Sequence, residues 1–366
     1  MLIDGVDMRQ ASRASVIFRF AGREDLAAIG EFLRELGGPY FDQKRFPGKS
    51  TRDYYEWKYF GNRLGNAAVG VAISDARVVG LVAAMVKPLQ VGERRLIAYE
   101  LGDFLTARDF RKCGLFSQLV EMVCNETKAR GASLVYVQPN DISFPILCKL
   151  GFAEPQQIHQ RSYAVPSRLM ARRLHVSPKL IRWTHIDELA RYVATPPGDG
   201  NVRVERIMRF DAETDQIWQN ARNGYSFLLV RENEFLNWRY ADSPTRFQIW
   251  TARRGAESAG FLVGFSATEE RQSEIVDLFT SAGDRAAARA LLHHAFEEFH
   301  SQGMRSILAY TLVDSPHSMV GELLRRACPL VRQSPLHFAV RSFDAAVTAQ
   351  MPVAGWHLSP GDFDGV

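Results

Sequence analysis

Short runs in which apolar and polar residues alternate are the main pattern along this chain, and they come in pairs. Residues 68–73 and 78–85 form one pair, and residues 247–252 and 259–265 form another. Alternation over such short lengths predicts β-strands. The brief polar breaks between the members of each pair predict two hairpins.

Each predicted hairpin is followed by a central strand, an amphipathic helix and one more strand. The central strands share three polar residues at one spacing, in Glu100-Leu-Gly-Asp103-Phe-Leu-Thr106 and Glu274-Ile-Val-Asp277-Leu-Phe-Thr280. The apolar stripes of the two helices are Leu115, Phe116, Leu119, Val120 and Val123, then Leu291, Leu292, Ala295 and Phe296. Gly131 and Gly303 predict the helix ends. Strands are predicted next, over 134–138 and 306–311.

A third repeat lies before each hairpin, where Asp53-Tyr-Tyr-Glu-Trp57-Lys-Tyr59 matches Glu234-Phe-Leu-Asn-Trp238-Arg-Tyr240. Acid, aromatic, Trp, base and Tyr recur in the same order. Aromatic residues at matching places in duplicated units favour core packing or a shared interface between the halves. Stacking on an acceptor by Tyr54 or Trp57 is the alternative.

These repeats predict an α/β fold of two tandem domains, each with a mixed central sheet flanked by helices. The polar stretch 195–201, which contains proline and glycine, predicts the boundary between them. We therefore expect a first domain over 15–165, a connector over 166–201 and a second domain over 202–343.

Composition supports a globular chain of two domains. With 366 residues, 46% of them hydrophobic and 23% charged, the chain is long enough for two cores. No apolar run approaches the roughly 20 residues that span a bilayer, and the start lacks a signal pattern, so we expect no membrane span and a cytoplasmic protein. The four cysteines show no paired spacing, which argues against disulfides and a metal site; they are Cys113, Cys124, Cys148 and Cys328.

The formal charge of +4 is modest, and its densest cluster runs from Arg168 to Arg182. This basic stretch favours a solvated connector over a membrane-surface or nucleic-acid patch. No series of aromatic residues for base stacking accompanies it, so we expect no nucleic-acid partner.

Candidate chemistry lies between the first central strand and its helix, in Phe110-Arg111-Lys112-Cys113-Gly114-Leu115-Phe116-Ser117. A basic turn that leads into a helix N-terminus is an anion cradle, because the first amides of the helix lack partners and the helix dipole is positive there. Gly114 lets the backbone approach a phosphate closely, and Arg111 and Lys112 add charge.

The loop resembles the Arg/Gln-x-x-Gly-x-Gly/Ala motif of the GNAT (general N-acetyltransferase) superfamily, although Phe116 replaces its last small residue. A second match is Asn140-Asp-Ile-Ser143-Phe-Pro-Ile-Leu-Cys-Lys-Leu-Gly151-Phe152, which resembles the superfamily's next cofactor-side motif. The resemblance implies that acetyl-CoA or another acyl-CoA binds the first domain. It implies that these residues contact the cofactor: Leu105, Thr106, Ala107, Arg111, Lys112, Cys113, Gly114, Leu115, Phe116, Asn140 and Ser143.

An acyl transfer to an amine also needs residues that take and give protons, and the sequence offers more than one candidate for each. A general base must take a proton from the acceptor amine, and Glu100 or its rival Asp103 could do so. Strand alternation places them on opposite faces unless a bulge intervenes. Because Glu274 and Asp277 recur in the second half, a structural role is the alternative for both. Many members carry a tyrosine as general acid where this chain has Leu147, so Tyr163, Cys148 or water would have to protonate the thiolate.

The second half has no comparable loop. Its corresponding segment is Asp284-Arg-Ala-Ala-Ala288-Arg289, in which Ala288 stands for Gly114 and Asp284 puts a negative charge where phosphate would bind. Such an alanine-rich segment predicts a plain helix start.

We therefore expect an acyl-CoA-dependent N-acyltransferase, acting on a small amine such as an amino sugar or a secondary metabolite. A non-catalytic acyl-CoA sensor and an aminoacyl-tRNA-dependent transferase of the same fold stay open, and the sequence leaves the oligomeric state undetermined. The modest charge argues against the tRNA-dependent alternative.

Overall fold

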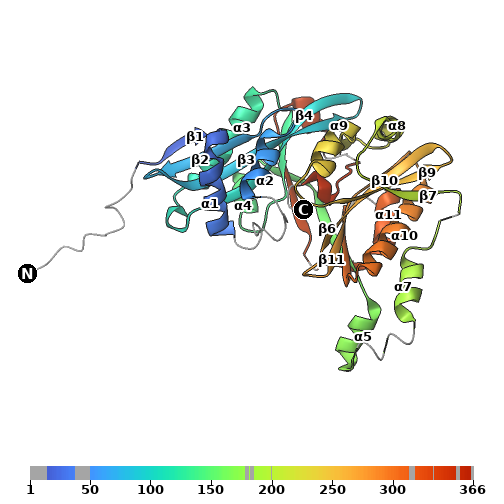
Figure 1. The fold of residues 1–366 in the computed structure, drawn as a ribbon. Helices are drawn as coiled ribbons and strands as arrows, with labels where there is room; N and C mark the ends of the chain where they lie inside the picture. Colours follow the sequence, from blue (N-terminus) through green and yellow to red (C-terminus); the bar gives the residue numbers. More distant parts are fainter. Residues whose placement is uncertain are drawn as a thin grey trace, which may run out of the picture.

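The chain folds around one continuous β-sheet that runs through both halves (Figure 1). The computed structural model describes residues 15–37, 50–177, 181, 185–198, 200–312, 318–332, 334–351 and 355–363. The elements of the first half and the connector are, in chain order, β1 (Ile17–Phe20), η1 (Arg23–Asp25), α1 (Leu26–Gly37), α2 (Thr51–Phe60), β2 (Ala68–Ser74), β3 (Arg77–Val91), β4 (Arg94–Thr106), η4 (Arg108–Phe110), α3 (Leu115–Ala129), β5 (Leu134–Val137), α4 (Phe144–Lys149), β6 (Ala153–Ala164), α5 (Pro166–Leu174) and α7 (Ile186–Ala194).

The second half repeats the order of hairpin, central strand, helix and strand, and adds the short strands β8 and β13 and a tail. Its elements are β7 (Arg203–Ile207), α8 (Ala212–Ala221), η5 (Arg222–Gly224), β8 (Phe227–Leu229), α9 (Asn233–Leu236), η6 (Asn237–Ala241), β9 (Gln248–Arg254), β10 (Glu257–Ala267), β11 (Gln272–Thr280), α10 (Arg285–Ser301), β12 (Ser306–Leu312), α11 (Met319–Ala327), β13 (Leu330–Val331), β14 (Leu336–Ser342), α12 (Ala345–Gln350) and η8 (Pro360–Asp362).

The predicted hairpins, central strands and amphipathic helices are confirmed. β2 pairs with β3 and β9 with β10, both antiparallel, and the central strands are β4 and β11. The predicted apolar stripes of α3 and α10 are buried except for half-exposed Phe116, and the helices end before Gly131 and Gly303, which have φ of 86° and 77°. Left-handed φ values of this kind favour glycine at a helix end.

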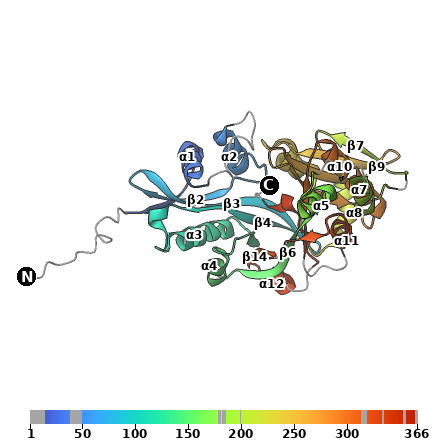
Figure 2. The same cartoon turned by 90° about the horizontal axis from the view of Figure 1, so that it is seen from below.

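Helices cover both faces of the sheet. In the first half α1 and α2 lie on one face and α3 and α4 on the other (Figure 2). Helix α2 begins with a capping box, since Asp53 N donates to Ser50 Oγ (3.1 Å) and Ser50 N donates to Asp53 Oδ2 (2.9 Å). A side chain on β4 therefore points either toward α1 and α2 or toward α3 and α4.

The two halves exchange their last strands. The sheet order is β1-β2-β3-β4-β5-β14-β6-β12-β11-β10-β9-β7, so β14 ends the first half's sheet and β6 ends the second half's. Ala339 of β14 lies opposite Val137 of β5, and Tyr163 of β6 lies opposite Ile307 of β12. The predicted domain ranges 15–165 and 202–343 are therefore interleaved in space.

The predicted connector contains two helices, α5 and α7. Asp187 accepts bonds from the backbone N (2.8 Å) and Oγ (2.6 Å) of Ser167, and both residues are buried. The basic stretch predicted there is described in part: Lys179 and Arg182 lie outside the described residues.

A tail after β14 packs between the halves. Tyr136 Oη of β5 donates to Asp362 O (2.8 Å), whereas Arg239 of the second half donates to Gly361 O (3.0 Å) and Phe363 O (2.8 Å). Trp356 stacks on Phe227 with ring centres 4.3 Å apart. The ordered chain thus continues past the predicted end at 343.

The recurring tryptophans form the other contact between the halves. Trp57 and Trp238 stack with ring centres 5.3 Å apart, Trp57 Nε1 donates to Trp238 O (2.9 Å), and Trp238 Nε1 donates to Trp57 O (3.4 Å). The prediction of a shared interface is confirmed.

Candidate functional site

The basic loop before α3 is open to solvent. Arg111, Lys112, Cys113 and Gly114 are exposed, and Lys112 and Gly114 have φ of 64° and 78°. Gly114 is the N-cap residue of α3, and this helix start has no side-chain cap. Left-handed residues before a helix turn successive N–H groups toward a concave side, which suits an anion. A Cβ at Gly114 would come within 4 Å of Gln118 Nε2 alone, at 3.7 Å, so the cradle is unfilled by protein atoms.

The end of β4 borders a gap in the sheet next to this loop. β4 and β5 pair in parallel from Ala98 to Glu100, and the ladder then stops while β4 continues to Thr106. Ala107 N donates to Val79 O (2.9 Å), and Thr106 O accepts from Arg111 Nε (3.3 Å). Because neighbouring strand residues alternate in direction, Thr106 presents its backbone to the gap, whereas Leu105 and Ala107 present theirs to β3. Leu105, Thr106 and Ala107 are all predicted to contact the cofactor, but only the backbone N–H and C=O of Thr106 are directed into the gap.

The second predicted motif forms a capped turn. Asn140 Oδ1 accepts from Ile142 N (3.0 Å) and Ser143 N (2.9 Å), and Ser143 precedes α4. Leu147 is fully buried in α4, whereas Cys148 is exposed. Asn140 therefore holds the turn together through its oxygen, and its amide nitrogen is the atom left to meet a ligand. Leu115 is buried, and Phe116 packs edge-on against Phe104 of β4 (5.1 Å).

Glu100 and Asp103 lie on the same face of β4, the one that α2 covers. The β3–β4 register shifts by one residue between Leu81 and Ala83, and Asp103 has a φ of 52°. Such a bulge returns the next side chain to the same face. Glu100 Oε2 lies 2.9 Å from Lys87 Nζ, with both side chains buried. The bulge therefore puts Glu100 and Asp103 on one face of the strand, although strict alternation predicts opposite faces.

Asp103 is held by two residues of the repeated Trp-Lys-Tyr segment. Its Oδ2 lies 2.8 Å from Lys58 Nζ and accepts from Tyr59 Oη (2.7 Å). Burial, and then the charge of Asp103, raise the pKa of Tyr59, which keeps this hydroxyl a donor. Lys58 was not identified from the sequence as a partner of Asp103, although the matching base Arg239 in the repeat was a signal for it.

Tyr163 does not come near the other predicted residues. It lies on β6 in the core of the second half, where its ring packs against Phe296 (5.3 Å). Burial raises its pKa to about 12. The strand exchange carries this tyrosine away from the first half's loop, so the structure does not return it to the cleft.

The second half differs from the first at both of the corresponding places. Asp284 caps α10 by accepting from Ala287 N (3.0 Å), and it pairs with Arg254 (3.0 Å). Here a carboxylate occupies the position at a helix start where an anion would bind. Ala288 is fully buried.

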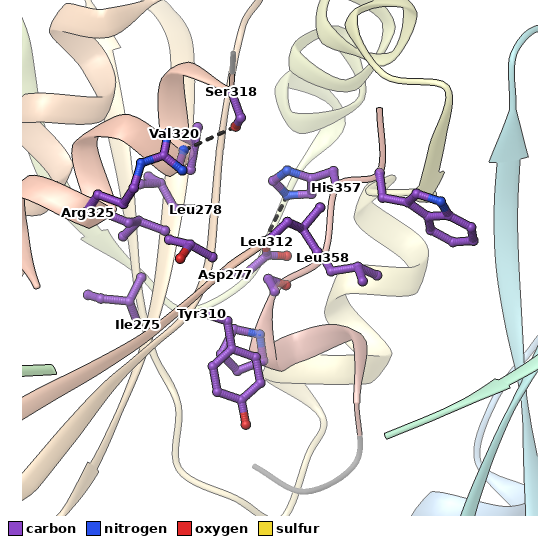
Figure 3. Close-up of a pocket in the computed structure, with 16 residues that line it drawn as sticks. Ile275, Asp277, Leu278, Tyr310, Leu312, Ser318, Val320, Arg325, His357 and Leu358 are labelled. Carbon is purple, nitrogen blue, oxygen red and sulfur yellow. Dashed lines mark hydrogen bonds and ion pairs between the residues drawn. The ribbon is translucent and has the colours of Figure 1, made fainter. Parts of the chain in front are cut away.

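The gap between β11 and β12 is covered by the tail (Figure 3). A cleft with about 490 Å³ of space, part of it open solvent, lies between Asp277, Tyr310 and the tail residue His357. Asp277 is bound by Arg231 (3.1 Å) and Tyr240 (3.3 Å), and Arg231 also holds Asp362 (2.9 Å). The tail thus lines and narrows the place in the second half that corresponds to the open gap in the first.

No group of three or more His, Cys, Asp and Glu side chains within the described ranges could hold a metal ion. The four cysteines are free thiols. Burial raises the pKa of Cys124 and of Cys328 to about 12.

Comparisons with known proteins agree with this geometry. Residues 41–154 match the family model "Acetyltransferase (GNAT) domain". The chain has no significant sequence match among curated proteins.

Three solved structures share the fold across most of the chain. A conserved protein of unknown function from Enterococcus faecalis, described as a probable N-acyltransferase, has a TM-score of 0.62 at 13% identity, over 90% of this chain and 73% of that one. The N-myristoyltransferase of Saccharomyces cerevisiae, solved with myristoyl-CoA, has a TM-score of 0.57 at 10% identity, over 92% and 81%. A GCN5-related N-acetyltransferase from Kribbella flavida has a TM-score of 0.55 at 14% identity, over 91% and 72%. At these identities the likeness is one of fold.

Proposed function

We propose that this member of the GNAT acetyltransferase superfamily, which has the tandem form of the fold, transfers an acyl group from acyl-CoA to the amine of a small acceptor. One observation carries the proposal: the two helix starts differ. That of α3 is open, basic and uncapped, whereas that of α10 is capped by Asp284. The acyl-CoA site therefore lies in the first half.

The residues of the first half fit this ligand by type and position. The exposed loop from Arg111 to Gly114 offers N–H groups and positive charge to a pyrophosphate. Thr106 offers backbone groups to the pantetheine amides at the gap beside β5. When bound, the cofactor supplies the thioester that the acceptor amine attacks.

Glu100 is our candidate for the base that takes the amine proton. The surroundings of Asp103 recur in the second half, where Tyr240 donates to Asp277 as Tyr59 donates to Asp103, so this aspartate fits a structural role. The Lys87–Glu100 pair is not repeated at the matching described positions, where Ala267 of β10 stands in the place of Lys87. Because Leu147 is buried and Tyr163 is distant, water or exposed Cys148 protonates the leaving thiolate.

A small amine is the acceptor class that we propose, with amino sugars the first to test. Acetyl-CoA titrated into the full chain in a calorimeter should give one site per chain. Gly114→Asp should abolish binding, since it puts a carboxylate into the anion cradle.

Gly283 offers a matched control for this substitution. It lies just before Asp284, the N-cap of α10, with a φ of 72°, close to the 78° of Gly114, and a Cβ there would meet no atom within 4 Å. Gly283→Asp should therefore bind acetyl-CoA like the wild type. Two equivalent sites, or retained affinity in Gly114→Asp, would overturn the assignment.

Thiol release then tests for turnover. If amino sugars and other small amines are offered with acetyl-CoA, free CoA should accumulate with at least one of them. Binding without release for every amine would instead support a non-catalytic acyl-CoA-binding protein, which the missing tyrosine at Leu147 would suit.

A further inference from the structure

Exposed apolar side chains concentrate on the two connector helices. Of the fourteen large apolar side chains that are exposed among the described residues, six belong to α5 or α7, although each helix has only nine residues. They are Leu169, Met170, Leu174, Leu189, Tyr192 and Val193. We call this set the connector patch. Scattered exposed apolar residues are ordinary, but a cluster marks an interaction surface.

The two helices that carry the connector patch are bound to each other and to the second half. Leu189, Tyr192 and Val193 follow helical spacing on α7, so they share one face, and their exposed fractions are 64%, 59% and 56%. The buried bonds between Ser167 and Asp187 hold the helices together. Arg191 pairs with Glu297 (2.7 Å), and Arg326 donates to Val193 O (3.2 Å). Figure 1 shows α5 and α7 projecting from the second half, away from the first.

The charge on the α5 side of the patch is positive. Arginines occur in the sequence of α5 at 168, 172 and 173. Arg173 of α5 is exposed, and α5 contains no acid. On α7 the exposed acid is Glu188, which lies 3.2 Å from His185.

This combination of apolar and basic side chains fits an anionic lipid surface. On α5 the exposed Arg173 lies one turn after Leu169 and Met170, so basic and apolar side chains share the solvent-facing side of the helix. Laid on an anionic bilayer, that side can put its apolar side chains into the acyl boundary and its charge against lipid phosphate. A second copy of the chain fits less well, since a symmetric contact through this patch would bring the same basic α5 of two copies together. No described helix is long and apolar enough to cross a bilayer, so the contact would be peripheral.

We propose that the connector patch docks this protein onto the surface of an anionic lipid bilayer. The proposal is independent of the acyl-CoA site, which lies in the other half. It predicts that membrane binding and cofactor binding can be removed separately.

Co-sedimentation of the full chain with vesicles tests the proposal. Phosphatidylcholine vesicles with about 30% phosphatidylglycerol should bind it, and pure phosphatidylcholine vesicles should bind it far less. Raising the salt from about 0.1 M to about 0.5 M should weaken binding. The double variant Leu189→Ser/Tyr192→Ser and the variant Arg173→Glu should each lower the partition coefficient at least about tenfold.

Met208→Ser is the matched control, because Met208 is 79% exposed but lies outside the patch. It should bind vesicles like the wild type, and all variants should keep the wild-type melting temperature and acetyl-CoA affinity. Equal binding to neutral vesicles, or wild-type binding by the patch variants, would refute the proposal. So would a dimer in light scattering that binds no vesicles and that the double variant dissociates, because the patch would then serve a second copy.

Discussion

Glu100 and its repeat counterpart Glu274 occupy matching strand positions but have different neighbours. Glu100 lies opposite Met85, and Lys87 stands two residues further along β3. Glu274 lies opposite Phe265, and the residue two further along β10 is Ala267. The repeat thus retains the glutamate without its lysine, which allows the two glutamates to have different roles.

If Glu100 is the base, Glu100→Gln should lower turnover by about 10²-fold or more, with little change in acetyl-CoA affinity. The loss should shrink at high pH, where more of the acceptor amine is already neutral. Glu274→Gln should keep near wild-type turnover. Steady-state thiol release across pH for both variants measures the difference.

Because the Lys87–Glu100 ion pair is buried, a second variant is needed to separate lost catalysis from lost stability. Glu100→Gln leaves Lys87 buried beside a neutral group, which costs about 3–5 kcal/mol, so lower activity alone could reflect partial unfolding. Lys87→Met/Glu100→Gln removes both charges and should regain stability. If turnover returns with stability, Glu100 is structural; if the melting temperature returns while turnover stays low, Glu100 is the base.

At the scale of single residues, the sequence was sufficient to find the loop and the two carboxylates but not their orientation. Strict alternation separates Glu100 from Asp103, yet the bulge brings both toward α2. One extra strand residue barely changes the hydrophobic pattern, so the bulge could not be predicted. Helix propensity and one acidic residue were enough to predict the closed start of α10, because that feature is local.

Among the elements, the tail is held to the second half by buried charge. Arg231 is bound to Asp277 and Asp362, and all three are buried. Burial by itself would raise the pKa of Asp277, but Arg231 and His357 together outweigh it and lower this pKa to about 2. A carboxyl whose pKa falls on folding adds stability above its unfolded pKa of about 3.9, and this stability is lost as the pH falls toward 2.

Asp277→Asn should therefore flatten the acid side of the stability profile. It removes one of the two carboxylates that pair with Arg231 and leaves Asp362, so the free energy of unfolding near pH 6 should drop by about 1–3 kcal/mol. Between about pH 4 and pH 2 the variant should lose less further stability than the wild type. Urea unfolding at several pH values measures both effects, and parallel profiles for the two proteins would contradict this account.

Sequence patterns predicted the elements themselves well but not their partners. The stripes of α3 and α10 and the alternation in β2, β3, β9 and β10 are local signals, and they gave the correct elements. The pairing of β14 with β5 depends on residues some 200 positions apart, which no local pattern encodes. The packing of the tail was missed for the same reason.

For the whole molecule, the shared sheet means that neither half is complete alone. A fragment of residues 15–165 lacks β14, so β5 loses a neighbour and β6 loses both β14 and β12. Exposed strand edges of this kind promote aggregation. We expect the fragment to show no cooperative thermal transition in circular dichroism, in contrast to the full chain.

Residues 334–343 appended to that fragment through a short flexible linker provide the control. Arg332 N donates to Gln160 O, so the start of β14 lies close to the end of β6 and a short linker can reach. The appended strand should restore a cooperative transition. A well-folded fragment without it would show that the exchanged strand is dispensable.

The place of β14 near the end of the chain also has a consequence during synthesis on the ribosome. The gap between β5 and β6 stays unfilled while roughly 170 further residues are translated, from Ala164 to Leu336. At about 5–20 residues per second this takes on the order of 10–40 s. Throughout that time the nascent chain exposes two bare strand edges, so its yield in the cell should depend on chaperones that bind emerging chains and on the pace of translation through the second half.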